Sequence, residues 1–228
     1  MSRPDRRMEI LEAAAEAMSA HGFHGMSMRE LAKATGMGLS SFYNYFESKD
    51  DVLFAIQSRA FGALIASVEG ALADVEGSAN RLYVFIHNHV LYFAEHPAVM
   101  RVLIHEAAAL SPARRKQIRQ LKERYFAIGQ AIVRQVLSTG CDAPNAKGAL
   151  LVDAAELERV TYSVFGMLNW IYGWYDAERH GEVAEVAHTI HKMALAGMVA
   201  RCPRRMVPDE GLDDRFGRAR PLLAAKGA

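Results

Sequence analysis

The segment that most constrains the fold is residues 27–49, which read SMRELAKATGMGLSSFYNYFESK. Ser27 and Glu30 have the spacing of a capping box, in which each side chain binds the other residue's backbone amide at the start of a helix. Gly36 stands where such a helix would end in a left-handed residue. We therefore expect one helix over residues 28–35, a glycine turn and a second short helix.

The second helix is expected over residues 40–46, and its two sides differ. Phe42, Tyr45 and Phe46 share one side at helical spacing and should face the core. Short polar groups and one phenol occupy the other side and its edge: Ser40, Ser41, Asn44 and Tyr43. This layout is typical of a helix-turn-helix, whose second helix lies in the major groove of DNA.

These polar side chains can bind DNA in different ways. Asn44 can bond adenine through both amide atoms, and serine can donate to or accept from most base edges. Tyr43 is placed to reach a phosphate, and Lys49, in the first turn of the next helix, is placed to anchor one. The helical wheel adds Arg29. The DNA-binding candidates are Arg29, Ser40, Ser41, Tyr43, Asn44 and Lys49.

The same pattern also fits a purely structural role. Two capped helices with a glycine turn are also a common way to pack a core. In that case the chain is an all-α small-molecule-binding or interaction protein with a purely structural helix-turn-helix.

The order of seven residues in this segment is more specific: Ala32, Gly36, Phe42, Tyr43, Phe46, Ser48 and Lys49. This order resembles the TetR family of bacterial repressors, and the resemblance covers residues 6–55. It implies DNA contacts by Ser41, Tyr43 and Lys49. Gly38 and Leu39 depart from the more polar residues often found there, which would leave base readout to fewer side chains.

Size and charge limit the class of DNA binder. The chain has 228 residues, of which 51% are hydrophobic, and its net charge is only +1. Residues 1–50 contain six Lys or Arg against seven Asp or Glu. This balance argues against a strongly basic, non-specific binder and is compatible with a dimer that docks two local patches.

Composition also bears on location. Two cysteines, Cys141 and Cys202, fit a reducing cytosol better than a disulfide framework. Glutamates interrupt the first apolar stretch, so no signal peptide is expected. The longest run without charge, residues 160–175, is shorter than a spanning helix needs. We expect a soluble, cytoplasmic protein with no membrane contact.

Helical periodicity covers almost the whole chain, and no stretch alternates like a strand. Helices are expected at residues 4–21, 49–70, 80–95, 98–110, 112–137, 153–176 and 182–201, with a loop at 138–148. The expected fold is all-α: an N-terminal three-helix helix-turn-helix head in residues 1–48 and a larger helical-bundle body for ligand binding and dimerisation in residues 49–202. Residues 203–228 are expected to form a polar tail.

Bulky aromatic and methionine side chains gather on the expected helices of the body. Their default role is core packing, but together they could also line an adaptable apolar cavity that contains a few hydrogen-bonding groups. Buried polar groups among them would need partners, which a ligand could supply. The expected ligand-binding residues are Phe85, His89, Tyr92, Phe93, Met100, Leu103, Tyr125, Phe126, Phe165, Asn169 and Trp170.

A second resemblance concerns the effector. Residues 161–181, TYSVFGMLNWIYGWYDAERHG, are similar to the C-terminal region of TetR regulators that respond to fatty-acyl or other acyl-CoA compounds. The resemblance implies a hydrophobic acyl effector. A basic run could attract CoA phosphates or could simply be a solvated helix face: Arg114, Arg115, Lys116, Arg119, Lys122 and Arg124.

The last expected helix has an apolar stripe with small residues: Val183, Val186, Ala187, Ile190, Ala194, Gly197 and Met198. Paired with the 153–176 helix and their two-fold copies, it would form a four-helix interface. One helix-turn-helix reads only a half-site. We therefore expect a homodimer on a palindromic, double-stranded operator, with recognition helices about 34 Å apart.

Enzymatic motifs are missing from the sequence. Glu185 and His188 form one ExxH pair, whereas a di-iron bundle needs two such helices and two more carboxylates. There is no GxSxG, P-loop or dinucleotide fingerprint. We expect no catalytic residues, metal or cofactor. The leading hypothesis is a repressor that an apolar ligand releases from DNA by shifting the 49–70 helix.

Overall fold

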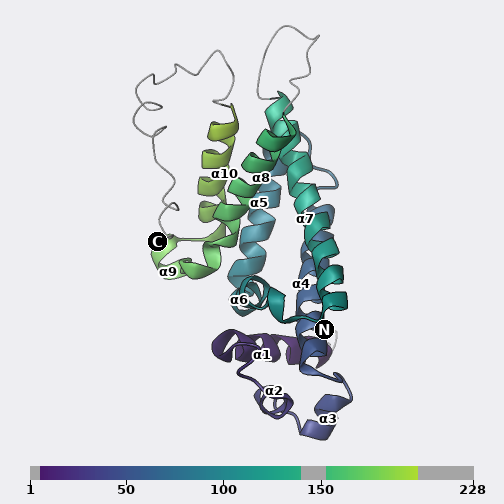
Figure 1. The fold of residues 1–228 in the computed structure, drawn as a ribbon. Coiled ribbons are helices and arrows are strands. Elements are labelled where there is room, and N and C mark those ends of the chain that lie inside the picture. The colour runs from purple at the N-terminus through teal and green to yellow at the C-terminus, as the bar shows by residue number, and fades with distance from the viewer. Residues whose placement is uncertain (1–5, 140–152, 200–228) are drawn as a thin grey trace, which may run out of the picture.

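The computed structural model describes residues 6–139 and 153–199, and every regular element in these ranges is helical, which confirms the all-α class (Figure 1). The α-helices are α1 Arg6–His21, α2 Met28–Ala34, α3 Leu39–Tyr43, α4 Lys49–Ala71, α5 Ser78–Glu95, α6 Pro97–His105, α7 Pro112–Thr139, α8 Ala154–Asn169, α9 Ala177–His180 and α10 Val183–Val199. Single 3-10 turns follow α6 and α8, at Ala107–Ala109 and Ile171–Gly173.

The first three helices form a small head at one end of the molecule, and α4 runs from this head into the body (Figure 1). The head is closed by Met18, Leu31, Phe42 and Phe46, each at most 1% exposed. Helix α1 also packs against α6 and α4. The buried side chains of head and body therefore form one continuous core, through which movement in the body can reach the head.

The body is built around α5, which packs against α4, α7 and α10. A helix with neighbours on three sides must be apolar over much of its circumference. Helix α4 is long and apolar enough to cross a membrane by length and composition alone. Its inward side chains, such as Val52, Leu64 and Val68, are buried against other helices of the fold, as expected of a central core helix.

The prediction of one helix over residues 153–176 is wrong. Helix α8 ends at Asn169, and backbone amides of Gly173 and Trp174 then bond to carbonyls three residues earlier, which tightens the chain into a 3-10 turn. That turn buries Ile171. Asp176 starts α9 by accepting from the Arg179 amide at 3.1 Å. Cys141, Cys202, residues 140–148 of the predicted loop and the predicted tail lie outside the described residues.

Candidate functional site

Helix α2 begins and ends with the predicted contacts. The Ser27 amide donates to Glu30 Oε2 at 2.7 Å, and the Glu30 amide donates to Ser27 Oγ at 3.3 Å. Hydrogen bonds donated by the Ser27 hydroxyl and the Ser27 amide lower the pKa of the Glu30 carboxyl. At the other end of α2, the amides of Gly36 and Met37 bond to the carbonyls of Lys33 and Ala32, which is a Schellman motif. Gly36 has a φ of +69°, so glycine is the residue that fits there.

Helix α3 is shorter than predicted. It spans Leu39–Tyr43, and Asn44 is its C-cap and not an interior residue. The amide of Tyr45 bonds to the Phe42 carbonyl three residues back, at 3.0 Å, so the helix tightens and the chain turns toward α4. Phe46 is thereby buried against Phe42, with ring centroids 5.4 Å apart.

The outer surface of the helix-turn-helix carries the predicted polar set. Ser40, Ser41 and Asn44 are exposed, and Tyr43 is 48% exposed, although it is a large aromatic side chain. Arg29 is exposed on α2. These five side chains are therefore free to meet a partner.

Lys49 has a different environment. Its Nζ donates to the Phe23 carbonyl at 2.8 Å and lies 4.5 Å from the centroid of the Phe23 ring. The lysine thus joins the first turn of α4 to the segment between α1 and α2. Sequence reasoning missed this bond, because it joins residues 26 positions apart. DNA binding by Lys49 stays a prediction.

A polar junction links the start of α4 to the start of α7. Asp50 accepts from the Ser111 amide at 2.8 Å, from Ser111 Oγ at 3.0 Å and from Arg114 Nη1 at 3.1 Å. Arg114 Nη2 also donates to Asp51 at 3.0 Å. We call this group the junction: Asp50, Asp51, Ser111 and Arg114. It lies next to the head, and no local sequence pattern predicts it.

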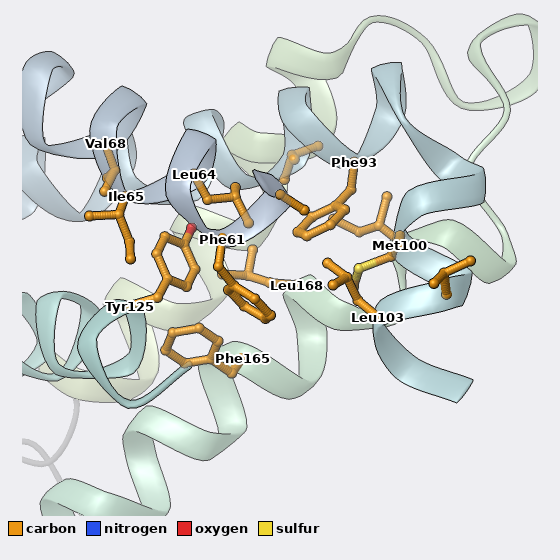
Figure 2. Close-up of a cluster of buried hydrophobic side chains, with 14 of the residues drawn as sticks. Phe61, Leu64, Ile65, Val68, Phe93, Met100, Leu103, Tyr125, Phe165 and Leu168 are labelled. Atoms are coloured by element: carbon orange, nitrogen blue, oxygen red, sulfur yellow. The ribbon is translucent and has the colours of Figure 1, made fainter. Parts of the chain in front are cut away.

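A cavity of about 360 Å³ lies among α4, α5, α6, α7 and α8. Figure 2 shows part of its apolar wall, where Phe61, Phe93, Met100 and Phe165 come together from separate helices. Eight predicted ligand-binding residues line it: His89, Phe93, Met100, Leu103, Tyr125, Phe126, Phe165 and Asn169. The lining also includes residues that sequence reasoning did not select: Phe61, Leu64, Ile104, Lys122, Glu123 and Tyr162.

Three predicted ligand-binding residues lie elsewhere. Phe85 is buried behind the wall, stacked on Tyr125 with centroids 5.5 Å apart. Tyr92 lines a small pocket beside α1 and α4, where burial raises the pKa of its hydroxyl to about 12. Trp170 follows the end of α8 and is 64% exposed. Because α5 is packed on several sides, spacing alone could not tell which side of it faces the cavity.

The cavity has one polar pair at its wall. His89 is only 2% exposed, and its Nδ1 lies 3.0 Å from the Tyr125 hydroxyl. Burial lowers the pKa of His89 to about 3 and raises that of Tyr125, so both are neutral at physiological pH. Lys122, half-buried, lines the same cavity with its Nζ 5.7 Å from the centroid of the Phe61 ring. Burial lowers the pKa of Lys122 as well.

The basic run on α7 is partly used within the fold. Arg114 belongs to the junction, Arg115 donates to the carbonyls of Ala108 and Leu110, and Arg124 pairs with Glu69 at 2.8 Å. These three guanidinium groups are therefore not simply a solvated helix face.

The predicted apolar stripe of α10 is wrong as a dimer face, because most of it is buried within the chain, where α10 packs against α5: Val186, Ala187, Ile190, Ala194 and Met198. An open groove runs along α8 and α10. Its lining includes Trp170, Trp174 and Met193, all large apolar side chains left exposed in the single chain. Among the residues that the structure describes, no cluster of three or more histidine, cysteine, aspartate or glutamate residues is arranged to hold a metal ion.

Comparison with known proteins gives matches over both parts of the chain. The family model for bacterial regulatory proteins of the tetR family matches residues 10–56, and a tetracyclin repressor-like C-terminal domain matches residues 76–198. A fatty acid metabolism regulator protein of Bacillus subtilis is 23% identical, over 58% of this chain and 69% of its own length.

Solved structures of similar fold include regulators of the same family. The TetR family regulator PfmR of Thermus thermophilus superposes with a TM-score of 0.69 at 27% identity, covering 82% of this chain and 96% of its own. AibR, solved in complex with isovaleryl coenzyme A and operator DNA, has a TM-score of 0.68 at 24% identity, covering 83% and 97% respectively. The second likeness establishes the fold alone.

Proposed function

The chain belongs to the tetR family of bacterial regulatory proteins, and from that premise we propose that it is a repressor released from its operator by a hydrophobic acyl compound. Regulators of this family bind operator DNA and small-molecule effectors and act as dimers. We propose that α8 and α10 make the homodimer contact, that the protein is cytoplasmic, and that each α3 binds one half-site of a palindromic operator.

One observation supports the regulatory step most strongly. The cavity is lined by α4 and α7, through Phe61 and Tyr125, and the same two helices are bonded to each other at the junction beside the head. A ligand that separates these walls would change the angle at which α4 carries the head. Such a ligand acts only if it binds the two states with different affinities.

The chemistry of the cavity supports an acyl effector. Its wall is mostly aromatic and aliphatic, and a volume of about 360 Å³ falls in the range of small-molecule sites. Lys122, at the cavity, and the exposed Lys116 and Arg119 on the same helix could face the phosphates of a CoA group. The AibR complex with isovaleryl coenzyme A offers a precedent within the same fold.

Operator binding is tested by gel shift on the DNA upstream of the protein's own gene. Asn44→Ala should relax preference at one base pair, at a loss of about 1–3 kcal/mol, whereas Tyr43→Phe should weaken binding to all sequences alike. If neither variant changes affinity or sequence preference, α3 does not read DNA. The chain would then be an all-α small-molecule-binding or interaction protein.

Effector binding is tested separately by thermal shift with acyl-CoA compounds of graded chain length. A rise in Tm that peaks at one chain length is expected, because ligand bound only to the folded state stabilises it. An unchanged Tm at every length would exclude acyl-CoA.

A further inference from the structure

His89 lines the cavity, and one of its two ring nitrogens has no hydrogen-bond partner among the described residues. Its Nδ1 is bonded to the Tyr125 hydroxyl, but its Nε2 is buried and has no partner among the described residues. No other described residue lining the cavity has a buried polar side-chain atom in that state. Aromatic rings surround the imidazole, with the Phe93 centroid at 4.7 Å and the Phe165 centroid at 6.2 Å.

The possible proton positions on His89 and Tyr125 indicate whether Nε2 is a donor or an acceptor. If Tyr125 donates its proton to Nδ1, then the neutral ring carries its own proton on Nε2, and only that N–H lacks a partner. If instead Nδ1 donates to the phenol oxygen, both the Tyr125 proton and the Nε2 lone pair are left unused. The first arrangement leaves fewer buried polar groups unsatisfied, so His89 offers an N–H donor.

A buried N–H donor on His89 restricts which ligands bind well in the cavity. Leaving a buried N–H unbonded costs about 1–3 kcal/mol, so an occupant without an acceptor binds at a disadvantage. A site built to hydrogen-bond an oxygen discriminates strongly against an analogue that lacks it. An anionic acceptor is disfavoured, because its charge would lie among the aromatic rings around His89, and the described cavity lining holds an anion, Glu123, as well as its one cation, Lys122.

We propose that the effector carries a neutral acceptor oxygen, such as a ketone, ester or thioester carbonyl, in the part that enters the cavity, where His89 Nε2–H donates to it. This inference rests on the proposed role of the cavity as the effector site. It adds a polar requirement that apolar lining alone does not impose.

Two probes of equal shape test the proposal without DNA. Octan-2-one has the carbonyl oxygen, and 2-methyloct-1-ene replaces it with a methylene group. Dissociation constants of both are measured for the wild-type full-length protein and for His89→Phe. Comparing the ratio of the two constants between proteins cancels the difference in their transfer from water. Loss of the donor should shift this ratio by about 5- to 150-fold against the ketone.

Met100→Leu serves as the matched control, since it alters the same cavity without touching a hydrogen bond. It should change both constants alike. A ratio that His89→Phe leaves unchanged would overturn the proposal and would indicate that water or nothing meets Nε2.

A second measurement holds even if His89→Phe fails to fold. Nitrogen-15 NMR of the wild-type histidines should show the His89 ring protonated at Nε2 in the free protein. Protonation at Nδ1 would overturn the proposal. The gel shift tests the repressor function independently: release of operator by acyl-CoA that is equal in wild type and His89→Phe contradicts only the role of His89.

Discussion

The guanidinium of Arg114 lies 3.1 Å from the carboxylate of Asp50, which bonds the first turn of α7 to the first turn of α4 directly beside the helix-turn-helix. Both side chains are only about 28% exposed, so this pair is less screened by water than a surface pair. The same two helices contribute Phe61 and Tyr125 to the cavity. The junction therefore bonds two cavity-lining helices to each other beside the head.

Arg114→Met should uncouple the two sites. Methionine keeps apolar contact with the Phe54 ring, over which the guanidinium now lies at 5.3 Å, but it removes both ion pairs. Effector affinity without DNA should change little, whereas the coupling free energy of about 1–3 kcal/mol should fall toward zero. Operator titrations with and without effector measure it. Arg124→Met, which removes an exposed pair with Glu69, is the control; a wild-type response in Arg114→Met would refute the role of the junction.

Lys49→Met should destabilise the head. It removes the hydrogen bond to the Phe23 carbonyl and the cation–π contact with the same ring, together about 1–2 kcal/mol of unfolding free energy. Urea denaturation measures this loss, with exposed Lys33→Met expected to be neutral. If Lys49 also binds a phosphate, the salt dependence of operator binding should fall by about one charge. An unchanged salt slope together with lost stability would leave Lys49 purely structural.

Gly129→Ala should disturb the cavity wall. A Cβ at Gly129 would lie 2.9 Å from ring atoms of both Phe165 and Phe85, which are buried and cannot move freely. Overpacking of this kind costs about 1–3 kcal/mol, more than the gain of up to about 1 kcal/mol in helix propensity. Gly62→Ala, with nothing within 4 Å of the new Cβ, should instead be neutral or slightly stabilising. Thermal melts compare them, and equal Tm changes would contradict the packing argument.

Acid should destabilise the protein partly through His89. The pKa of its ring is about 3 in the folded protein and 6.5 in the unfolded chain, so below pH 6.5 the unfolded state binds a proton that the folded state does not. Unfolding free energy should therefore fall as the pH drops from 6.5 toward 3, by up to about 1.4 kcal/mol per pH unit for this one group. His89→Phe should lose that share of the slope in urea titrations between pH 7 and pH 4. An identical slope in the variant would mean that His89 takes up its proton while folded.

The elements that sequence reasoning placed correctly depend on neighbours in the chain. The capping box of Ser27 and Glu30 and the stop at Gly36 involve contacts within a few residues, so their spacing is enough. The end of α8 could not be read in this way, because the apolar string continues beyond Asn169, and the turn is set by burial of Ile171 in the body.

The candidate sites also differ in whether their contacts are local or distant in the sequence. Exposure of Ser41, Tyr43 and Asn44 followed from the helical side that Phe42 and Phe46 bury. The junction between Asp50 and Arg114 joins residues 64 positions apart, and no local pattern carries it.

Operator affinity measured with and without bound effector tests the central claim most directly. Fluorescence anisotropy of labelled operator is followed at one fixed salt concentration, because phosphate contacts make affinity salt-dependent. With the acyl-CoA that raises Tm most, at saturating concentration, the dissociation constant should rise by about 5- to 150-fold. An unchanged constant, while the same acyl-CoA demonstrably occupies the protein, would contradict release of DNA by a ligand in this cavity.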